Sequence, residues 1–148
     1  MPDEKYMREA LELAQLAASI GEVPVGCVIV GPGGGVIGRG YNRRESKKSP
    51  LSHAETEAIG EAAAAIMDWR LEGCSIYVTL EPCPMCAGAI INARIPVLVY
   101  GAKDPSMGCC GSVLNLFEER LGFHPAIYGG VLSAESEALL KTFFKSLR

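Results

Sequence analysis

Short apolar runs that fit β-strands alternate along this chain with longer segments that fit α-helices. Residues 25–42 fit a hairpin, because two strand-like runs flank the glycine-rich turn GPGGG. Further strand-like runs lie at 74–80, 95–101 and 125–130, with helical segments between them. Strands linked through helices run parallel, with right-handed crossovers. The pattern therefore predicts a single α/β domain over residues 1–148, with a mixed five-stranded sheet in a three-layer α/β/α sandwich.

The helical segments are marked at their ends by turn-forming and capping residues. Gly21 is a stop signal for the first segment, and Ser133 is predicted to cap the last. Pro82 and Pro84 suit the first turn of the third segment. The predicted helices cover 6–22, 52–67, 82–93 and 133–147.

The composition indicates a folded protein outside the membrane. Apolar residues make up 49% of the chain and charged residues 21%, a balance that excludes a disordered chain. No apolar run reaches the roughly 18 residues of a membrane span. The N-terminal sequence MPDEKYMREA lacks the apolar core of a signal peptide. We therefore expect a cytoplasmic protein without a membrane partner.

The net charge of −3 argues against binding nucleic acid through overall charge. The segment RGYNRRESKK, at 39–48, nevertheless holds five of the 14 Lys and Arg residues and a single acid, Glu45. Two interpretations of this segment stay open. It is either a solvated loop or a local contact with phosphate groups.

The six cysteines are expected to be free thiols or metal ligands, because disulfides are rare without a secretory signal. Cys27 lies in an apolar run and is expected to fill the core. Cys83 and Cys86 form a C-x-x-C pair at a predicted helix start, where the helix dipole favours the metal-binding thiolate. A redox pair would need a thioredoxin-like context with the motif early in the domain. Cys109 and Cys110 lack ligand-like spacing to the others, which disfavours them as further ligands.

A zinc site at Cys83 and Cys86 needs at least one more ligand, and the chain has two histidines. His124 precedes a proline in a loop-like segment and is expected at the surface. His53 lies at a predicted helix start, where the dipole keeps the imidazole neutral, as a metal ligand must be. Three protein ligands leave the fourth tetrahedral position to water, which is typical of catalytic zinc sites.

Glu55 fits two patterns that differ in where its carboxylate points. With Ser52 it fits a helix capping box, in which the carboxylate folds back over the helix start. With His53 it fits H-x-E, in which the carboxylate moves the proton of a zinc-activated water. Together with PCPMC at 82–86, this is the H-x-E…P-C-x-x-C signature of zinc deaminases. Glu55 is therefore expected to point towards the metal, with Ser52 alone capping the helix.

The sequence resembles the bacterial tRNA-specific adenosine deaminases over nearly its whole length. The resemblance lies in the segments GEVPVGCVIV, GRGYNRRE, SHAE, YVTLEPCPMCAGAIINARI, YGAKDPSMGCCGSVLNL and ALLKTFFKSLR. It implies a cytidine deaminase-like fold and hydrolytic deamination of adenosine to inosine at the wobble position of a tRNA anticodon stem-loop. It also implies a homodimer with one Zn²⁺ per subunit, held by His53, Cys83 and Cys86, and Glu55 as the catalytic proton shuttle.

The resemblance further implies three substrate-binding residues, each of which also has a structural interpretation. Asn42 matches an asparagine whose amide offers a donor and an acceptor to the base, and Asp104 matches a position near the neighbouring nucleotide. Phe144 lies where the last helix borders the substrate. Asn42 and Asp104 also fit turns, and Phe144 fits the core. Trp69 is expected to be packed, and Glu57 is either a partner of the metal-site histidine or solvated.

Two other functions remain open from the sequence. A free-base or nucleoside deaminase acting on guanine, cytosine or cytidine would share the zinc site but differ in the 100–115 loop and the last helix, which here resemble the tRNA enzyme. A non-enzymatic zinc-binding module would have a closed four-ligand site and no need for Glu55.

Overall fold

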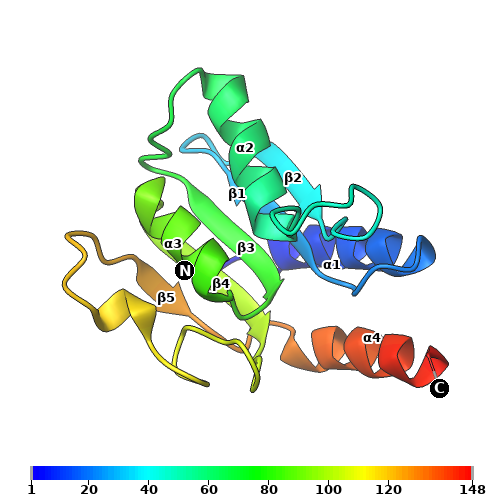
Figure 1. Cartoon of the computed structure of the whole chain (residues 1–148). Helices are drawn as coiled ribbons and strands as arrows, with labels where there is room; N and C mark the ends of the chain where they lie inside the picture. Colours follow the sequence, from blue (N-terminus) through cyan, green and yellow to red (C-terminus); the bar gives the residue numbers. More distant parts are fainter. Residues whose placement is uncertain (1, 148) are drawn as a thin grey trace.

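The computed structural model describes residues 2–147 and contains one five-stranded sheet with the strand order β2-β1-β3-β4-β5 (Figure 1). The central strand β3 pairs antiparallel with β1 and parallel with β4, and β4 pairs parallel with β5. The strands are β1 (Gly26–Val30), β2 (Val36–Tyr41), β3 (Ser75–Leu80), β4 (Val97–Ala102) and β5 (Ala126–Tyr128). The predicted hairpin and the mixed five-stranded sheet are confirmed.

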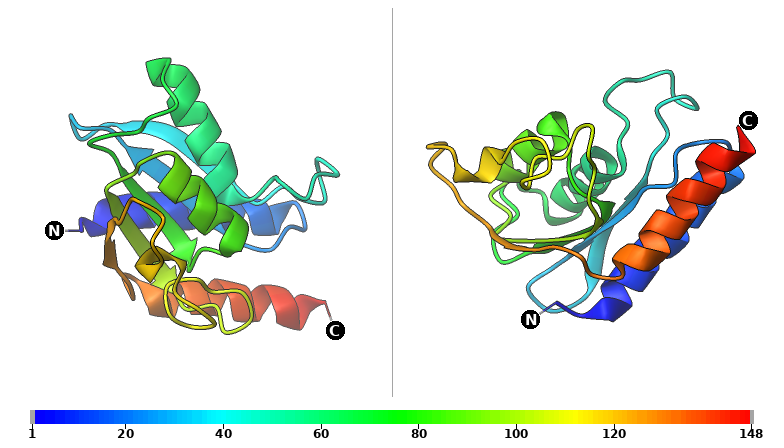
Figure 2. Two further views of the ribbon diagram at one scale, coloured as in Figure 1. Left: turned by 60° about the vertical axis from the view of Figure 1, so that its left-hand side comes forward. Right: turned by 90° about the horizontal axis from the view of Figure 1, so that it is seen from below.

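Helices cover both faces of the sheet. They are α1 (Glu4–Ser19), α2 (Ala54–Ile66), α3 (Pro84–Asn92) and α4 (Ser133–Ser146), with a 3-10 turn at Leu116–Glu118. Helices α2 and α3 pack on one face, and α1 and α4 lie side by side on the other (Figure 2). This arrangement is the predicted three-layer α/β/α sandwich. Within residues 2–147, no helix has the length and apolar character that a bilayer crossing requires.

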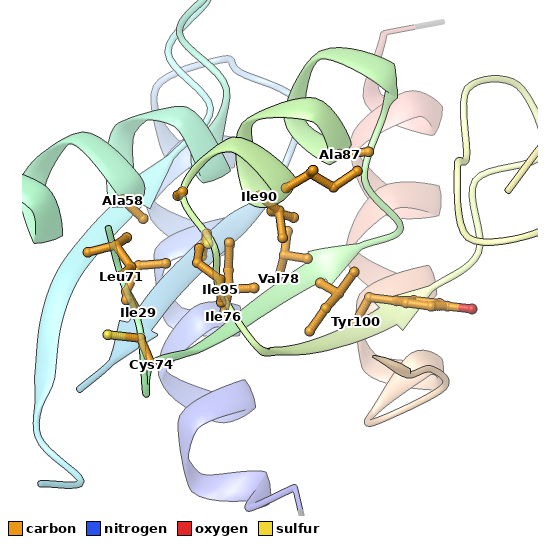
Figure 3. Packing of buried hydrophobic residues seen from close by; sticks show 14 of the residues in the cluster. Ile29, Ala58, Leu71, Cys74, Ile76, Val78, Ala87, Ile90, Ile95 and Tyr100 are labelled. Carbon is orange, nitrogen blue, oxygen red and sulfur yellow. The ribbon is translucent and has the colours of Figure 1, made fainter. Parts of the chain in front are cut away.

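The core is divided by the sheet into two apolar layers, because neighbouring residues of a strand point to opposite faces. Ile76 and Val78 point from β3 towards α2 and α3, where they pack with Ile90 (Figure 3). Tyr77, between them, points to the other face and packs with Met7 of α1. Cys27 is fully buried in the first layer, as predicted.

The glycines of β2 allow α2 to lie directly against the sheet. A Cβ atom on Gly38 would overlap the carbonyl oxygen of Ala58, and one on Gly40 would overlap that of Ala54. A side chain at either position would push the helix outwards, since both contacts are with backbone atoms of α2. The first turn of α2 is thereby held at the sheet edge where β2 ends.

Two local predictions outside the pocket region were wrong. Ser133 was expected to cap the last helix, but α4 begins at Ser133 itself after Leu132, whose φ of 53° lies in the left-handed region. Trp69 was expected to be packed, but 56% of its surface is exposed and the Arg70 guanidinium lies 4.9 Å from its ring centroid. Arg94 lies 5.9 Å from the same centroid, so the ring makes cation–π contacts at the surface instead of packing in the core.

Candidate active site

A pocket of about 510 Å³ lies at the edge of the sheet where β2, β3 and β4 end. These three strands run in the same direction, so their carboxyl ends meet at this edge. The segments that follow them provide Asn42, Glu81 and Lys103 to the pocket wall. The start of α2 and the C-terminal half of α4 also line the pocket.

Three potential metal ligands meet in this pocket region. His53 comes from the residue before α2, Cys83 from the residue before α3, and Cys86 from the first turn of α3. The His53 Nδ1 atom lies 3.6 Å from the Cys83 sulfur and 3.5 Å from the Cys86 sulfur. Pro84 occupies the first position of α3, where its missing N–H costs no hydrogen bond, and this start aims both cysteines the same way.

The spacing of these ligand atoms fits zinc. Tetrahedral Zn²⁺ with Zn–N near 2.0–2.1 Å and Zn–S near 2.3 Å separates a nitrogen from a sulfur ligand by about 3.6 Å. The two observed N···S distances agree with this value. Within residues 2–147, these three residues form the one group whose ligand atoms lie close enough together to share a metal ion. Cys109 and Cys110 lie outside the group.

The pKa values of the Cys83 and Cys86 thiols shift in opposite directions. A hydrogen bond with Cys86 lowers the pKa of Cys83 to about 4. The same bond, together with burial, raises the pKa of Cys86. The hydrogen bond to Cys83 raises the pKa of His53. A metal ion binding here must therefore displace protons from the cluster.

Glu55 is buried, with 4% of its surface exposed, and lies in the same pocket as His53 and Cys83. Burial raises the pKa of its carboxyl to about 7. A carboxyl in that range can both accept and donate a proton near neutral pH. Such a group beside three potential metal ligands is suited to proton transfer on a bound substrate.

The start of α2 is capped differently from the prediction. Ser52 was expected to be the N-cap, but that residue is His53, and the Thr56 hydroxyl accepts the His53 backbone N–H at 3.1 Å. The same hydroxyl donates to the Leu51 carbonyl oxygen. Thr56 thereby occupies the position that a reciprocal capping-box residue fills. Glu55 is left without a capping role.

The three predicted substrate-binding residues all line the pocket. The Asn42 amide donates to the Val23 carbonyl oxygen at 3.4 Å and accepts the Arg44 backbone N–H at 3.2 Å, which fixes it at the wall. Asp104 accepts the Ser106 backbone N–H at 3.0 Å, so it also forms the predicted turn. Phe144 is 47% exposed and is therefore not a core residue.

Ion pairs account for much of the basic segment at 39–48. Glu57 binds both Arg43 and Lys47, the latter at 3.2 Å, and Arg39 pairs with Glu9 at 3.2 Å. Glu57 is therefore neither a partner of His53 nor solvated. Among the described residues, Arg44 and Lys48 of this segment form no ion pair, and Arg44 lines the pocket. A phosphate contact therefore remains open, with Arg44 as the basic residue of the segment that faces the pocket.

Glu81 is a pocket residue that sequence reasoning missed. Only 2% of its surface is exposed, and it accepts hydrogen bonds from the loop at 104–112. The sequence gives no signal for this role, because the donors lie more than twenty residues away and most of them are backbone groups. His124 is exposed, as predicted.

Comparisons with known proteins agree with this site. The family model described as MafB19-like deaminase matches residues 1–148, so the class of protein is a deaminase. The tRNA-specific adenosine deaminase of Bacillus subtilis (strain 168) is 47% identical over 147 residues, which cover 99% of this chain and 91% of that protein. This chain therefore belongs to the tRNA-specific adenosine deaminase family, as its resemblance predicted.

Solved structures show the same fold. One, from studies of A-to-I editing by tRNA:A34 deaminases at the wobble position of transfer RNA, is 41% identical with a TM-score of 0.89 and covers 93% of this chain and 100% of that chain. A guanine deaminase from Bacillus subtilis is 36% identical with a TM-score of 0.66, covering 70% of this chain and 66% of that chain. The cytidine deaminase-like fold is confirmed.

Proposed function

We propose that this chain catalyses the hydrolytic deamination of adenosine to inosine at the wobble position of a tRNA anticodon. The observation that carries the proposal is the buried Glu55 carboxyl, which lies in the same pocket as His53 and Cys83 of the group that these two residues form with Cys86. The substrate is inferred from the relative named tRNA-specific adenosine deaminase and from the solved structure in studies of tRNA:A34 deaminases.

His53, Cys83 and Cys86 are assigned to hold one Zn²⁺ per chain. The N···S distances and the donor set of one imidazole and two thiols support this assignment. Zinc with three protein ligands supplies a water activated for attack at neutral pH. The protein must place the base and move the protons.

Glu55 is assigned the proton transfers. Its carboxylate accepts a proton from the water that attacks C6 of adenine and delivers that proton to ring N1. It then carries the second proton from the new C6 hydroxyl to the departing amine, so that ammonia leaves and the C6 carbonyl of inosine forms. The burial of Glu55 supports this role, because desolvation disfavours the charged form of a carboxyl and so makes its protonated form accessible.

Asn42, Asp104 and Phe144 are assigned to the RNA. Asn42 is assigned to the flipped base, because its buried amide lines the pocket and has a second donor and a second acceptor position beyond those used by Val23 and Arg44. Asp104 is assigned to the neighbouring nucleotide, and the exposed ring of Phe144 to the border of the bound RNA. Each of the three contacts is a target for a single substitution.

The active form is proposed to be a homodimer of this single domain over residues 1–148, located in the cytoplasm. The resemblance to the tRNA deaminases supports the dimer. The cytoplasm is supported by the six free cysteines, which a reducing compartment preserves. Light scattering on the eluting peak of a gel-filtration column tests the dimer.

A substrate panel tests the proposed activity. Zinc-loaded protein is incubated with an anticodon stem-loop carrying a wobble adenosine, and separately with guanine, cytosine and cytidine. Inosine is expected in the stem-loop, with no ammonia released from the free substrates. The fold shared with a guanine deaminase makes guanine the sharpest competitor. Ammonia from guanine alone would replace the proposal with free-base deamination.

A further inference from the structure

Both oxygens of the Glu81 carboxylate are occupied by one loop. Oε1 accepts the Asp104 backbone N–H at 3.0 Å and the Ser112 hydroxyl. Oε2 accepts the backbone N–H groups of Cys110 at 2.7 Å and Ser112 at 3.2 Å. The carboxylate thus joins the two ends of the loop at 104–112, and its side chain is nearly fully buried.

This loop forms one wall of the candidate active site. Residues 103–107 line the pocket, as does the start of α2. The middle of the loop lies against Glu81 itself: a Cβ atom on Gly108 would overlap the Glu81 carboxyl carbon and lie 2.6 Å from its Oε1. The loop therefore has no room to shift towards the sheet while the carboxylate is in place.

The segment 81–83 connects the loop to the three potential metal ligands. Glu81 holds the loop through its carboxylate, the Pro82 carbonyl oxygen accepts the Cys109 backbone N–H at 2.9 Å, and Cys83 belongs to the ligand group. A displacement of the loop relative to these ligands would require breaking the bonds to Glu81. The distance between the pocket wall and the reaction centre is thus set by three consecutive residues.

The chemistry requires a carboxylate at this position. Each of its oxygens accepts a backbone N–H, and both donors are fixed by the fold. A glutamine would direct its NH₂ group against one of them in either orientation, leaving a buried donor without an acceptor.

We propose that Glu81 is a positioning residue for the deamination, which fixes the loop at 104–112 as the substrate-facing wall at a set distance from the metal ligands. This inference rests on the proposed function for its substrate. It assigns Glu81 no contact with the reacting atoms. Loss of the Glu81 carboxylate should change the position of the loop and its contact with the RNA, whereas the proton transfers by Glu55 should be retained.

The test compares zinc-loaded wild type with Glu81→Gln, and uses Glu119→Gln, at an exposed residue, as the matched control. For Glu81→Gln, the zinc content is expected to equal that of wild type. The KM for the anticodon stem-loop should rise about tenfold and kcat should stay within about threefold, since the loss of a charge-assisted hydrogen bond acts here on substrate binding. Amide hydrogen exchange of Asp104, Cys110 and Ser112 should accelerate.

Ser112→Ala removes one of the four bonds and should change KM and the exchange rates in the same direction by less. It also carries the test if Glu81→Gln fails to fold. Unchanged amide exchange at 104–112, loss of zinc, or a fall in kcat at constant KM would overturn the proposal. If wild type is inactive on the stem-loop, the proposed function is rejected, while the exchange measurement still decides whether Glu81 holds the loop.

Discussion

Gly40 of β2 and Ala54 of α2 are in backbone contact, because a Cβ atom on Gly40 would overlap the Ala54 carbonyl oxygen. Gly40→Ala is therefore expected to destabilise the protein by about 1–3 kcal/mol, as other overpacked sites do. Urea unfolding measures the change. Gly60→Ala, in helix α2, is the control. A Cβ atom on Gly60 would meet nothing within 4 Å, so the stability should stay equal or rise by up to about 1 kcal/mol. Equal losses in both variants would contradict the contact.

The Thr56 hydroxyl is expected to stabilise the start of α2. Thr56→Val keeps the shape of the side chain but removes the hydroxyl that accepts the His53 backbone N–H, and should cost about 1 kcal/mol of unfolding free energy. Thr56→Ser retains the hydroxyl and should cost clearly less. Thermal or urea unfolding of the pair measures the difference, and equal stabilities would show that Thr56 does not cap the helix.

Glu55→Gln is expected to abolish deamination without unfolding the protein. The amide cannot carry protons from water to the leaving group, so kcat on the stem-loop should fall by about 10²–10⁴-fold. Stability should be retained, because the substitution replaces a buried carboxyl by a neutral group of the same shape. Zinc content, measured by mass spectrometry, should match wild type. A variant with wild-type kcat would remove Glu55 from the mechanism.

Zinc content should separate the ligand cysteines from the others. Cys83→Ser replaces a thiol of the three-residue cluster, and the purified protein is expected to hold much less zinc than wild type. Cys110→Ser, outside the cluster, should retain about one zinc per chain, the count of a single three-ligand site. Loss of zinc from Cys110→Ser would instead indicate a fourth protein ligand and favour a closed, structural site.

Acid is expected to destabilise the protein through Glu22, Glu57 and Glu81. Burial acts to raise the pKa of each carboxyl, but hydrogen bonds to the carboxylates outweigh it, so each pKa lies below its usual value of 4.5. Such groups contribute stability above their unfolded pKa and lose it as pH falls through the folded pKa. The urea midpoint should therefore decline below pH 4.5, the unfolded value. Glu22→Gln should show a shallower decline than wild type, and an equally steep one would exclude Glu22.

Much of the fold was predictable because its signals are local. The GPGGG turn between two apolar runs specified the hairpin, and the strand and helix patterns after it specified the parallel half of the sheet. The caps were less predictable. Ser52 and Thr56 are both hydroxyl residues near the start of α2, and which of them reaches a free backbone N–H depends on how the preceding loop enters the helix.

The sequence by itself determined which residues form the candidate site: His53, Glu55, Cys83 and Cys86 were selected from residue types at short spacings, and the structure brings them together at two helix starts. The tertiary structure alone decided what surrounds that chemistry. The pairing of Glu57 with Arg43 and Lys47, and the bonds from Glu81 to the loop at 104–112, join segments whose separation along the chain leaves no pattern. Their partners are chosen by which charges and backbone donors the packed sheet and helices bring together away from water.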